Sequence, residues 1–283
     1  MKAISRIEFK KALCRFATIT LCFAIIGCGS TSSPQQLAAD PPTPSSAPPP
    51  SGDATAPSFV AETDGSCATS LFAAACGKGT SAVLPPVAVS AVAGHALLVI
   101  VWFNDTPGSV VSSVSNGADT FKSLGSIADG TDFSSGVGVF LAQNIVGGAS
   151  NINVTVQRLS TASPAGISAS MVMVREYAGV LHGLDKTTTA YSNTISDMGT
   201  TFGAQIVPSL QNELVLAVCT ADFPLMAGNG AINFSSGPTG TFGGLFAEET
   251  PAPTATTMSP QFFIASLPSP PPGAYHELLV SIY

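Results

Sequence analysis

Residues 94–101 read Gly-His-Ala-Leu-Leu-Val-Ile-Val, an almost unbroken aliphatic run behind two turn-forming residues. The pattern recurs as Asn-Glu-Leu-Val-Leu-Ala-Val at residues 212–218 and as His-Glu-Leu-Leu-Val-Ser-Ile at residues 276–282. A strand with one face in water alternates apolar and polar residues, whereas a continuous run is typical of a strand buried on both faces. We therefore expect these three segments to be central strands.

The likeness of the three runs leaves two interpretations open. They mark two related halves of the chain, or they are alike only because buried strands use the same few aliphatic residues.

The remainder of residues 58–283 consists of short apolar runs separated by Gly, Pro, Asn, Asp and Ser. Runs of this length without intervening helices favour antiparallel sheets packed face to face. We predict an all-β domain over residues 58–283, an antiparallel, jelly-roll-like β-sandwich. The expected strands are residues 82–92, 96–103, 110–114, 120–124, 137–143, 152–158, 167–177, 184–191, 204–207, 213–220, 245–248, 262–266 and 277–283.

Several pieces of this region occur together in a recognisable order. They are the aliphatic strand at 97–103, Ser-Asn-Gly-Ala-Asp-Thr-Phe at 115–121, Asn-Ile-Val-Gly-Gly at 144–148 and Glu-Tyr-Ala-Gly-Val at 176–180. Together they resemble a β-sandwich module of secreted bacterial proteins of uncharacterised function. No piece is catalytic, so the resemblance implies a fold and no activity.

The first 27 residues have the pattern of an export signal, with five Lys and Arg residues ahead of a short apolar run at 16–26. That run is shorter than the ~20 residues of a membrane-spanning helix. It ends in Ile25-Ile26-Gly27-Cys28, which resembles the lipobox of bacterial lipoproteins. The resemblance implies cleavage after Gly27, acylation of Cys28 and anchoring in the outer membrane or at the cell surface. A cleaved signal with an unmodified Cys28 is the alternative.

Residues 28–57 are predicted to form a disordered tether behind Cys28, because Ser, Thr, Pro, Ala and Gly dominate and no hydrophobic period is present. At about 3.1 Å per residue in polyproline conformation, such a tether reaches roughly 80 Å.

The charge balance excludes a nucleic-acid-binding protein. The chain has 10 Lys and Arg against 17 Asp and Glu. Five of the bases and one acid precede residue 28, which leaves 5 bases and 16 acids, a net charge of −11. Nucleic-acid affinity depends on Lys and Arg that neutralise phosphates, and the mature chain has too few.

The cysteines fit an exported protein. Cys67 and Cys76 lie nine positions apart behind the tether, and we expect them to form a disulfide. Cys219 then stays unpaired and is expected in the core.

Rigid aromatic side chains are the candidate ligand contacts. Trp102, the only tryptophan, ends an aliphatic run, and Tyr177 and Tyr191 lie near predicted strand ends. Each ring could stack on a sugar, although the aliphatic neighbours of Trp102 favour a core position for that residue. In the strand that contains Tyr177, Arg175 and Glu176 are adjacent and must face opposite ways, so we expect one to point outward and the other to find a partner.

No catalytic residue can be assigned. No Gly-x-Ser-x-Gly motif occurs, and His95, His182 and His276 have no metal-ligand spacing. Oxygen-bearing side chains in two predicted loops could bind calcium, although solvated loop acids are the simpler interpretation. These calcium candidates are Asn116, Asp119, Asp129 and Asp132. No other cofactor is expected.

The leading hypothesis is a lipid-anchored surface module for binding or adhesion, with a glycan or another cell-surface polymer as partner. One alternative is a structural envelope component without a small ligand. The other is a hydrolase, a glycosidase or esterase, whose acids come together only in the folded chain.

Overall fold

The computed structural model describes most of the chain from Pro57 to Tyr283, all within one compact unit. The predicted signal peptide, Cys28 and the tether up to residue 56 lie outside the described residues, and so do Asp129 and Asp132. No helix within the described part is long and apolar enough to cross a membrane. The described residues are 57–68, 76–105, 108–127, 135–158, 166–179, 181–195, 201–202, 204–221, 225–227, 234–236, 244–252, 256–260, 262–264 and 273–283.

These residues form β-strands and no helix, which confirms the predicted all-β class. The strands are β1 (Ser58–Ala68), β2 (Ser81–Val83), β3 (Val87–Ala91), β4 (Ala96–Asn104), β5 (Val110–Ser115), β6 (Lys122–Ile127), β7 (Ser135–Ala142), β8 (Gly148–Gln157), β9 (Ala169–Ala178), β10 (Leu184–Ile195), β11 (Thr201–Phe202), β12 (Glu213–Ala221), β13 (Leu225–Ala227), β14 (Phe234–Ser236), β15 (Gly244–Ala252), β16 (Phe262–Ile264) and β17 (Gly273–Ile282).

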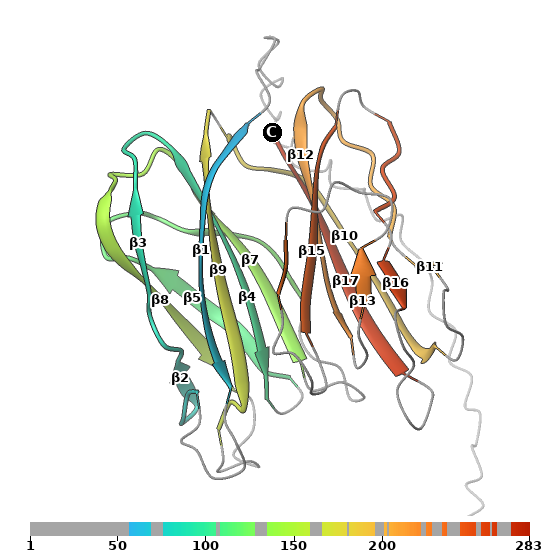
Figure 1. Ribbon diagram of the computed structural model, residues 1–283, viewed down its shortest axis with the longest axis horizontal. Coiled ribbons are helices and arrows are strands. Elements are labelled where there is room, and N and C mark those ends of the chain that lie inside the picture. Colours follow the sequence, from blue (N-terminus) through green and yellow to red (C-terminus); the bar gives the residue numbers. More distant parts are fainter. Residues whose placement is uncertain are drawn as a thin grey trace, which may run out of the picture. The chain divides into compact units, whose positions relative to one another are not determined.

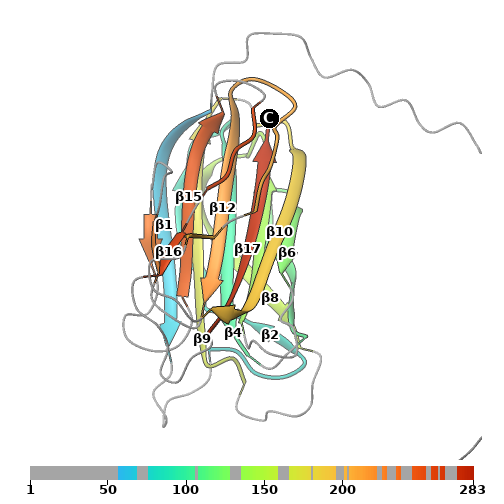
Figure 2. The same cartoon turned by 90° about the vertical axis from the view of Figure 1, so that its right-hand side faces the viewer.

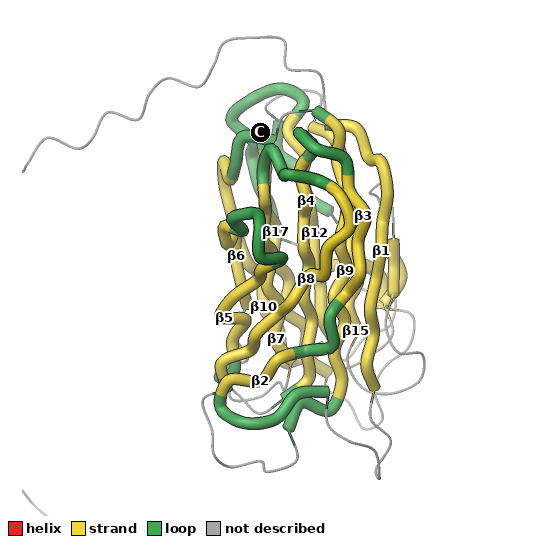
Figure 3. Tube along the Cα trace, turned by 90° about the vertical axis from the view of Figure 1, so that its left-hand side faces the viewer, coloured by secondary structure: helices red, strands yellow, loops and turns green. Residues whose placement is uncertain are grey.

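Two larger antiparallel sheets lie face to face in the middle of the molecule (Figure 1). Central sheet 1 has the order β1-β9-β4-β7-β6, and central sheet 2 has the order β10-β17-β12-β15-β14. Figure 2 shows β10, β17, β12 and β15 of central sheet 2 side by side. Outer sheet 1, formed by β2, β3, β5 and β8, covers the far face of central sheet 1 (Figure 3). Outer sheet 2 has the order β11-β16-β13.

Apolar side chains fill the space between successive sheets. One core separates the central sheets and includes Leu98 and Ile100 of β4 and Leu216 of β12. The alternate residues of β4, such as Val99, pack towards outer sheet 1. On the other side, Cys219 and Phe262 belong to the core between central sheet 2 and outer sheet 2. The runs in β4, β12 and β17 are therefore buried on both faces, as their continuous apolarity predicted.

The two halves of the described chain, β1–β9 and β10–β17, share one topology. If β2 and β3 are counted as one interrupted strand, the strands of each half can be numbered from first to eighth along the sequence. In both central sheets, the first strand then lies beside the eighth, followed across the sheet by the third, the sixth and the fifth. Each outer sheet has the order second, seventh, fourth. This is jelly-roll connectivity with the fifth strand at the edge of the central sheet. The molecule is thus a pair of jelly rolls packed through their central sheets.

Local irregularities repeat as well. The β1–β9 pairing shifts register between Phe59 and Ala61, and the β10–β17 pairing shifts between Leu184 and Lys186, at the equivalent place. Gly94 lies two residues before β4 and Asn212 lies directly before β12, and both have a positive φ, of 85° and 62°. Bulges and left-handed residues are costly unless a fold needs them. Their repetition favours two related halves over chance resemblance.

The predicted strands correspond to described strands with shifted ends, with two exceptions and four omissions. The predicted strand 82–92 is divided into β2 and β3. Residues 204–207 form only an isolated bridge, between Ile206 and Met258. The strands β1, β11, β13 and β14 were not predicted. The predicted disulfide between Cys67 and Cys76 is present, and Cys219 is a buried free thiol.

Candidate functional site

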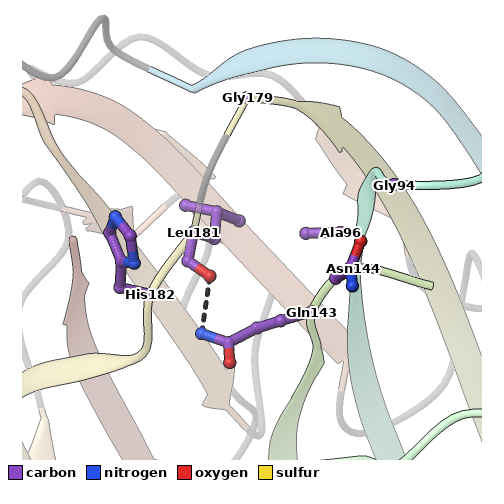
Figure 4. Close-up of a pocket in the computed structure, with 7 residues that line it drawn as sticks. All are labelled: Gly94, Ala96, Gln143, Asn144, Gly179, Leu181 and His182. Atoms are coloured by element: carbon purple, nitrogen blue, oxygen red, sulfur yellow. Dashed lines mark hydrogen bonds between the residues drawn. The ribbon is translucent and has the colours of Figure 1, made fainter.

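A pocket of about 320 Å³ lies at one end of the core between the two central sheets. Three chain segments line it: the start of β4, the residues that follow β7, and the connection between β9 and β10. Figure 4 shows this connection on one side of the pocket and the ends of the strands on the other. The lining residues are Gly94, Ala96, Gln143, Asn144, Gly179, Leu181 and His182.

Backbone geometry gives the pocket its walls. Asn144 turns the chain out of β7 with a φ of 49°, a left-handed conformation that asparagine tolerates better than most residues. The backbone N–H of Gly94 donates to the carbonyl oxygen of Ile145 at 2.9 Å, and the N–H of Ile145 donates to that of His95 at 3.0 Å. These bonds fix the ends of β4 and β7 against each other.

The connection between β9 and β10, which forms the opposite wall, is held by hydrogen bonds on two sides. The Gln143 amide donates to the carbonyl oxygen of Leu181 at 2.5 Å. The backbone N–H of His182 donates to the carbonyl oxygen of Tyr283, and the two rings stack with their centroids 5.8 Å apart. The connection between the halves is therefore tied to β7 on one side and to the C-terminus on the other.

The lining is polar at the rim and apolar below. Ala96 and Leu181 are buried and belong to the core between the central sheets. Asn144 and His182 are exposed, and within the described residues no hydrogen bond occupies the Asn144 amide or the His182 ring nitrogens. Among the described residues that line the pocket, none is Asp, Glu, Lys or Arg. This arrangement can hydrogen-bond a neutral polar ligand at the rim of the pocket.

His95 is next to two lining residues but points to the other face of central sheet 1. Its Nδ1 lies 2.6 Å from Oε1 of Glu176, which also accepts the backbone N–H of Val92 at 2.8 Å. In the second half, Glu213 has the same function, since it accepts the N–H of Leu210 at 2.5 Å and the hydroxyl of Ser281. Val92 and Leu210 occupy equivalent positions before β4 and β12. Each carboxylate supports a turn, and neither lines the pocket.

The prediction for Arg175 and Glu176 was half wrong. The two side chains do not pair with each other, as expected, but both are buried, because central sheet 1 is covered on both faces. Arg175 donates to Glu62 at 2.6 Å and to the Tyr177 hydroxyl at 2.9 Å. Its guanidinium also lies 4.3 Å from the centroid of the Phe59 ring.

The three aromatic residues proposed as ligand contacts lie apart from the pocket lining. Trp102 is fully buried, and its indole N–H donates to Oγ1 of Thr220 at 3.0 Å. Tyr177 is also fully buried, so neither ring presents a face to a ligand. Tyr191 is 47% exposed and packs edge-on against His276 with a centroid distance of 4.3 Å.

The two proposed calcium ligands that the structure describes, Asn116 and Asp119, take part in other hydrogen bonds. Asn116 donates to Asp119 at 2.6 Å and accepts the backbone N–H of Asp119, and Asp119 accepts the N–H of Val146. These bonds stabilise a turn. Among the described residues, no group of three or more His, Cys, Asp or Glu could hold a metal ion. Asp129 and Asp132 lie outside the described part.

Other titratable groups are buried away from the pocket. Burial, reinforced by Glu277, raises the pKa of the Cys219 thiol and raises that of Tyr275 to about 12. Burial lowers the pKa of His276. Glu277 accepts the N–H of Ala204 at 2.7 Å. Asp105 and Arg158 form a buried, two-point ion pair with distances of 2.6 and 2.8 Å. These groups belong to the cores of the two halves.

Sequence reasoning missed the pocket because its residues carry no charge and no motif. His182 was considered only as a catalytic or metal-ligating residue, and Gln143 and Asn144 were not considered as ligand contacts. The available signal was two consecutive amides at the end of an apolar strand, shortly before Gly147 and Gly148.

Comparison with protein families, with curated proteins and with solved structures gave no match.

Proposed function

We propose that this protein is a binding module of the cell envelope, anchored by a lipid on Cys28 and displayed on the tether of residues 28–57. Its ligand is a glycan or a similar hydroxyl-rich polymer, bound in the pocket at the end of the two central sheets. The proposal places the protein at the outer membrane or cell surface, with the membrane as its partner through the lipid.

The chemistry of the pocket supports binding over catalysis. Its lining offers two amides and one imidazole but no carboxylate. Glycoside hydrolysis needs two carboxyl groups on either side of the scissile bond, and ester hydrolysis needs an activated nucleophile. Amides, in contrast, both donate and accept hydrogen bonds, as sugar hydroxyls do. The uncharged lining is the observation on which the proposal rests.

The test uses the mature chain with Cys28→Ser, so that no lipid is attached, on an array of oligosaccharides. The wild-type domain is compared with a double variant, Asn144→Gly and His182→Ala. Glycine tolerates the positive φ at residue 144, so the amide is removed without backbone strain. Gln157→Ala, an exposed amide at the far end of β8, is the control.

We expect the wild-type domain and the control to bind the same glycans and the double variant to lose them. Equal binding by all three proteins would reject the pocket as the site. An absence of any glycan ligand would favour the structural envelope component, and turnover of a chromogenic glycoside or ester would favour the hydrolase.

A further inference from the structure

The distribution of the basic residues bears on which glycans the pocket can accept. Only Lys78, Lys122, Arg158, Arg175 and Lys186 follow residue 57. Both arginines are buried with a carboxylate partner, Asp105 for Arg158 and Glu62 for Arg175. The three lysines are exposed, and none of them lines the pocket.

An anionic ligand would therefore meet no counter-ion in the pocket. A uronate carboxylate or a sulfate that leaves water without a paired charge loses its hydration with no compensation. The 16 acids that follow residue 27, against 5 bases, add a repulsive field around the whole domain. Both effects act against acidic polysaccharides and phosphorylated glycans.

A neutral sugar ring is matched by the same groups. The Asn144 amide, the free oxygen of the Gln143 amide and the His182 imidazole can pair with hydroxyls. Ala96 and Leu181 beneath them are almost fully buried and add no charge to the site. The volume of about 320 Å³ is at the lower end for ligand pockets, which limits the ligand to about one or two sugar units.

We infer that the pocket selects uncharged sugar units and discriminates against anionic ones. This inference rests on the proposed function, since it specifies the ligand class of the same site. Its structural basis is the set of neutral hydrogen-bonding groups that line the pocket, in a domain whose exposed lysines all lie outside the lining.

The experiment compares matched oligosaccharides that differ only in charge. Glucose oligomers are paired with glucuronate oligomers of the same linkage, and galactose oligomers with their sulfated forms. Each is titrated into the unacylated mature chain at low and high salt. We expect the neutral member of a bound pair to bind at least about tenfold more tightly, a difference of ~1.4 kcal/mol, with little dependence on salt.

A charge-introducing variant provides the matched comparison. His182→Lys places an ammonium group at the exposed rim, and we expect it to raise affinity for the anionic member of each pair in a salt-dependent way. Tighter binding of the anionic member by the wild-type domain, abolished by Asn144→Gly with His182→Ala, would overturn the charge selectivity while leaving the proposed function intact. No pocket-dependent binding of either member of any pair would overturn both.

Discussion

Trp102 on β4 and Thr220 on β12 are joined by a hydrogen bond of 3.0 Å that crosses from one central sheet to the other. Both side chains have no solvent exposure, so the bond is a polar contact inside the apolar core between the two halves. A buried donor must find an acceptor, and here the acceptor belongs to the other jelly roll. This contact fixes how the two halves register against each other.

Replacing Thr220 by valine removes the acceptor and keeps the side-chain shape. The indole N–H of Trp102 is then buried without a partner, and we expect the free energy of unfolding to fall by about 1–3 kcal/mol. Denaturant unfolding measures the loss. The double variant Trp102→Phe with Thr220→Val should cost less than the two single changes added together. Additive costs would contradict a direct interaction.

Glu62 is the carboxylate partner of the buried Arg175. Glu62→Gln leaves that guanidinium charge without its counter-ion, and we expect a loss of ~3 kcal/mol in the free energy of unfolding. Asp64→Asn, two residues along β1 and exposed, removes the same charge from the same strand and should change stability by less than about 0.5 kcal/mol. Equal effects of the two substitutions would show that Arg175 does not depend on Glu62.

The lowered pKa of His276 predicts a pH dependence of stability. His276 is 9% exposed and its burial disfavours the charged imidazole, so the unfolded chain binds a proton at this residue more readily than the folded chain does. Stability should therefore fall as pH falls below the ordinary value of 6.5, until the folded imidazole is itself protonated. Burial raises the pKa of the Glu213 carboxyl above its ordinary value of 4.5. This shift has the opposite effect on stability: the free energy of unfolding falls as pH rises through and above 4.5, because the folded chain holds this proton more tightly than the unfolded chain does.

Comparison with His276→Phe isolates this contribution, because the effect of Glu213 is common to both proteins. Denaturant unfolding between about pH 5 and pH 7.5 should show a shallower slope of stability against pH in the variant. Identical slopes would assign the pH dependence to other groups.

The lipid anchor predicts a defined mature N-terminus. Mass spectrometry of the protein from a bacterial envelope should find a diacylglyceryl group on Cys28 and no residues before it. Cys28→Ser should release the protein from the membrane fraction. An unmodified Cys28 in a membrane-free protein would contradict the anchor.

The apolar pattern of the sequence predicted more of the fold than of the candidate site. Burial on both faces requires continuous aliphatic sequence, so β4, β12 and β17 were predictable, and two cysteines nine positions apart predicted their disulfide. The strand β1 was missed because its polar residues, such as Glu62 and Asp64, suit an edge exposed to water. The core position expected for Trp102 is confirmed, whereas the ligand prediction did not foresee the burial of Tyr177, since a single sequence does not show which end of a strand reaches solvent.

The pocket was beyond sequence reasoning for a different reason. Its lining combines residues from three segments that are far apart in the sequence. The pairing of β4 with β7 and β9 in central sheet 1, together with the path of the connection that follows β9, brings them together. Gln143 and Leu181 lie 38 positions apart, and the bond between them depends on the path of the connection that joins the halves.

The most direct measurement is an amide NMR titration of the unacylated mature chain with a neutral oligosaccharide selected from the array. We predict that the largest shift changes fall on Gly94, Ala96, Gln143, Asn144 and His182, and that Asn144→Gly with His182→Ala abolishes them. The largest changes at Tyr191 and His276, or a titration unaffected by the double variant, would contradict binding in this pocket.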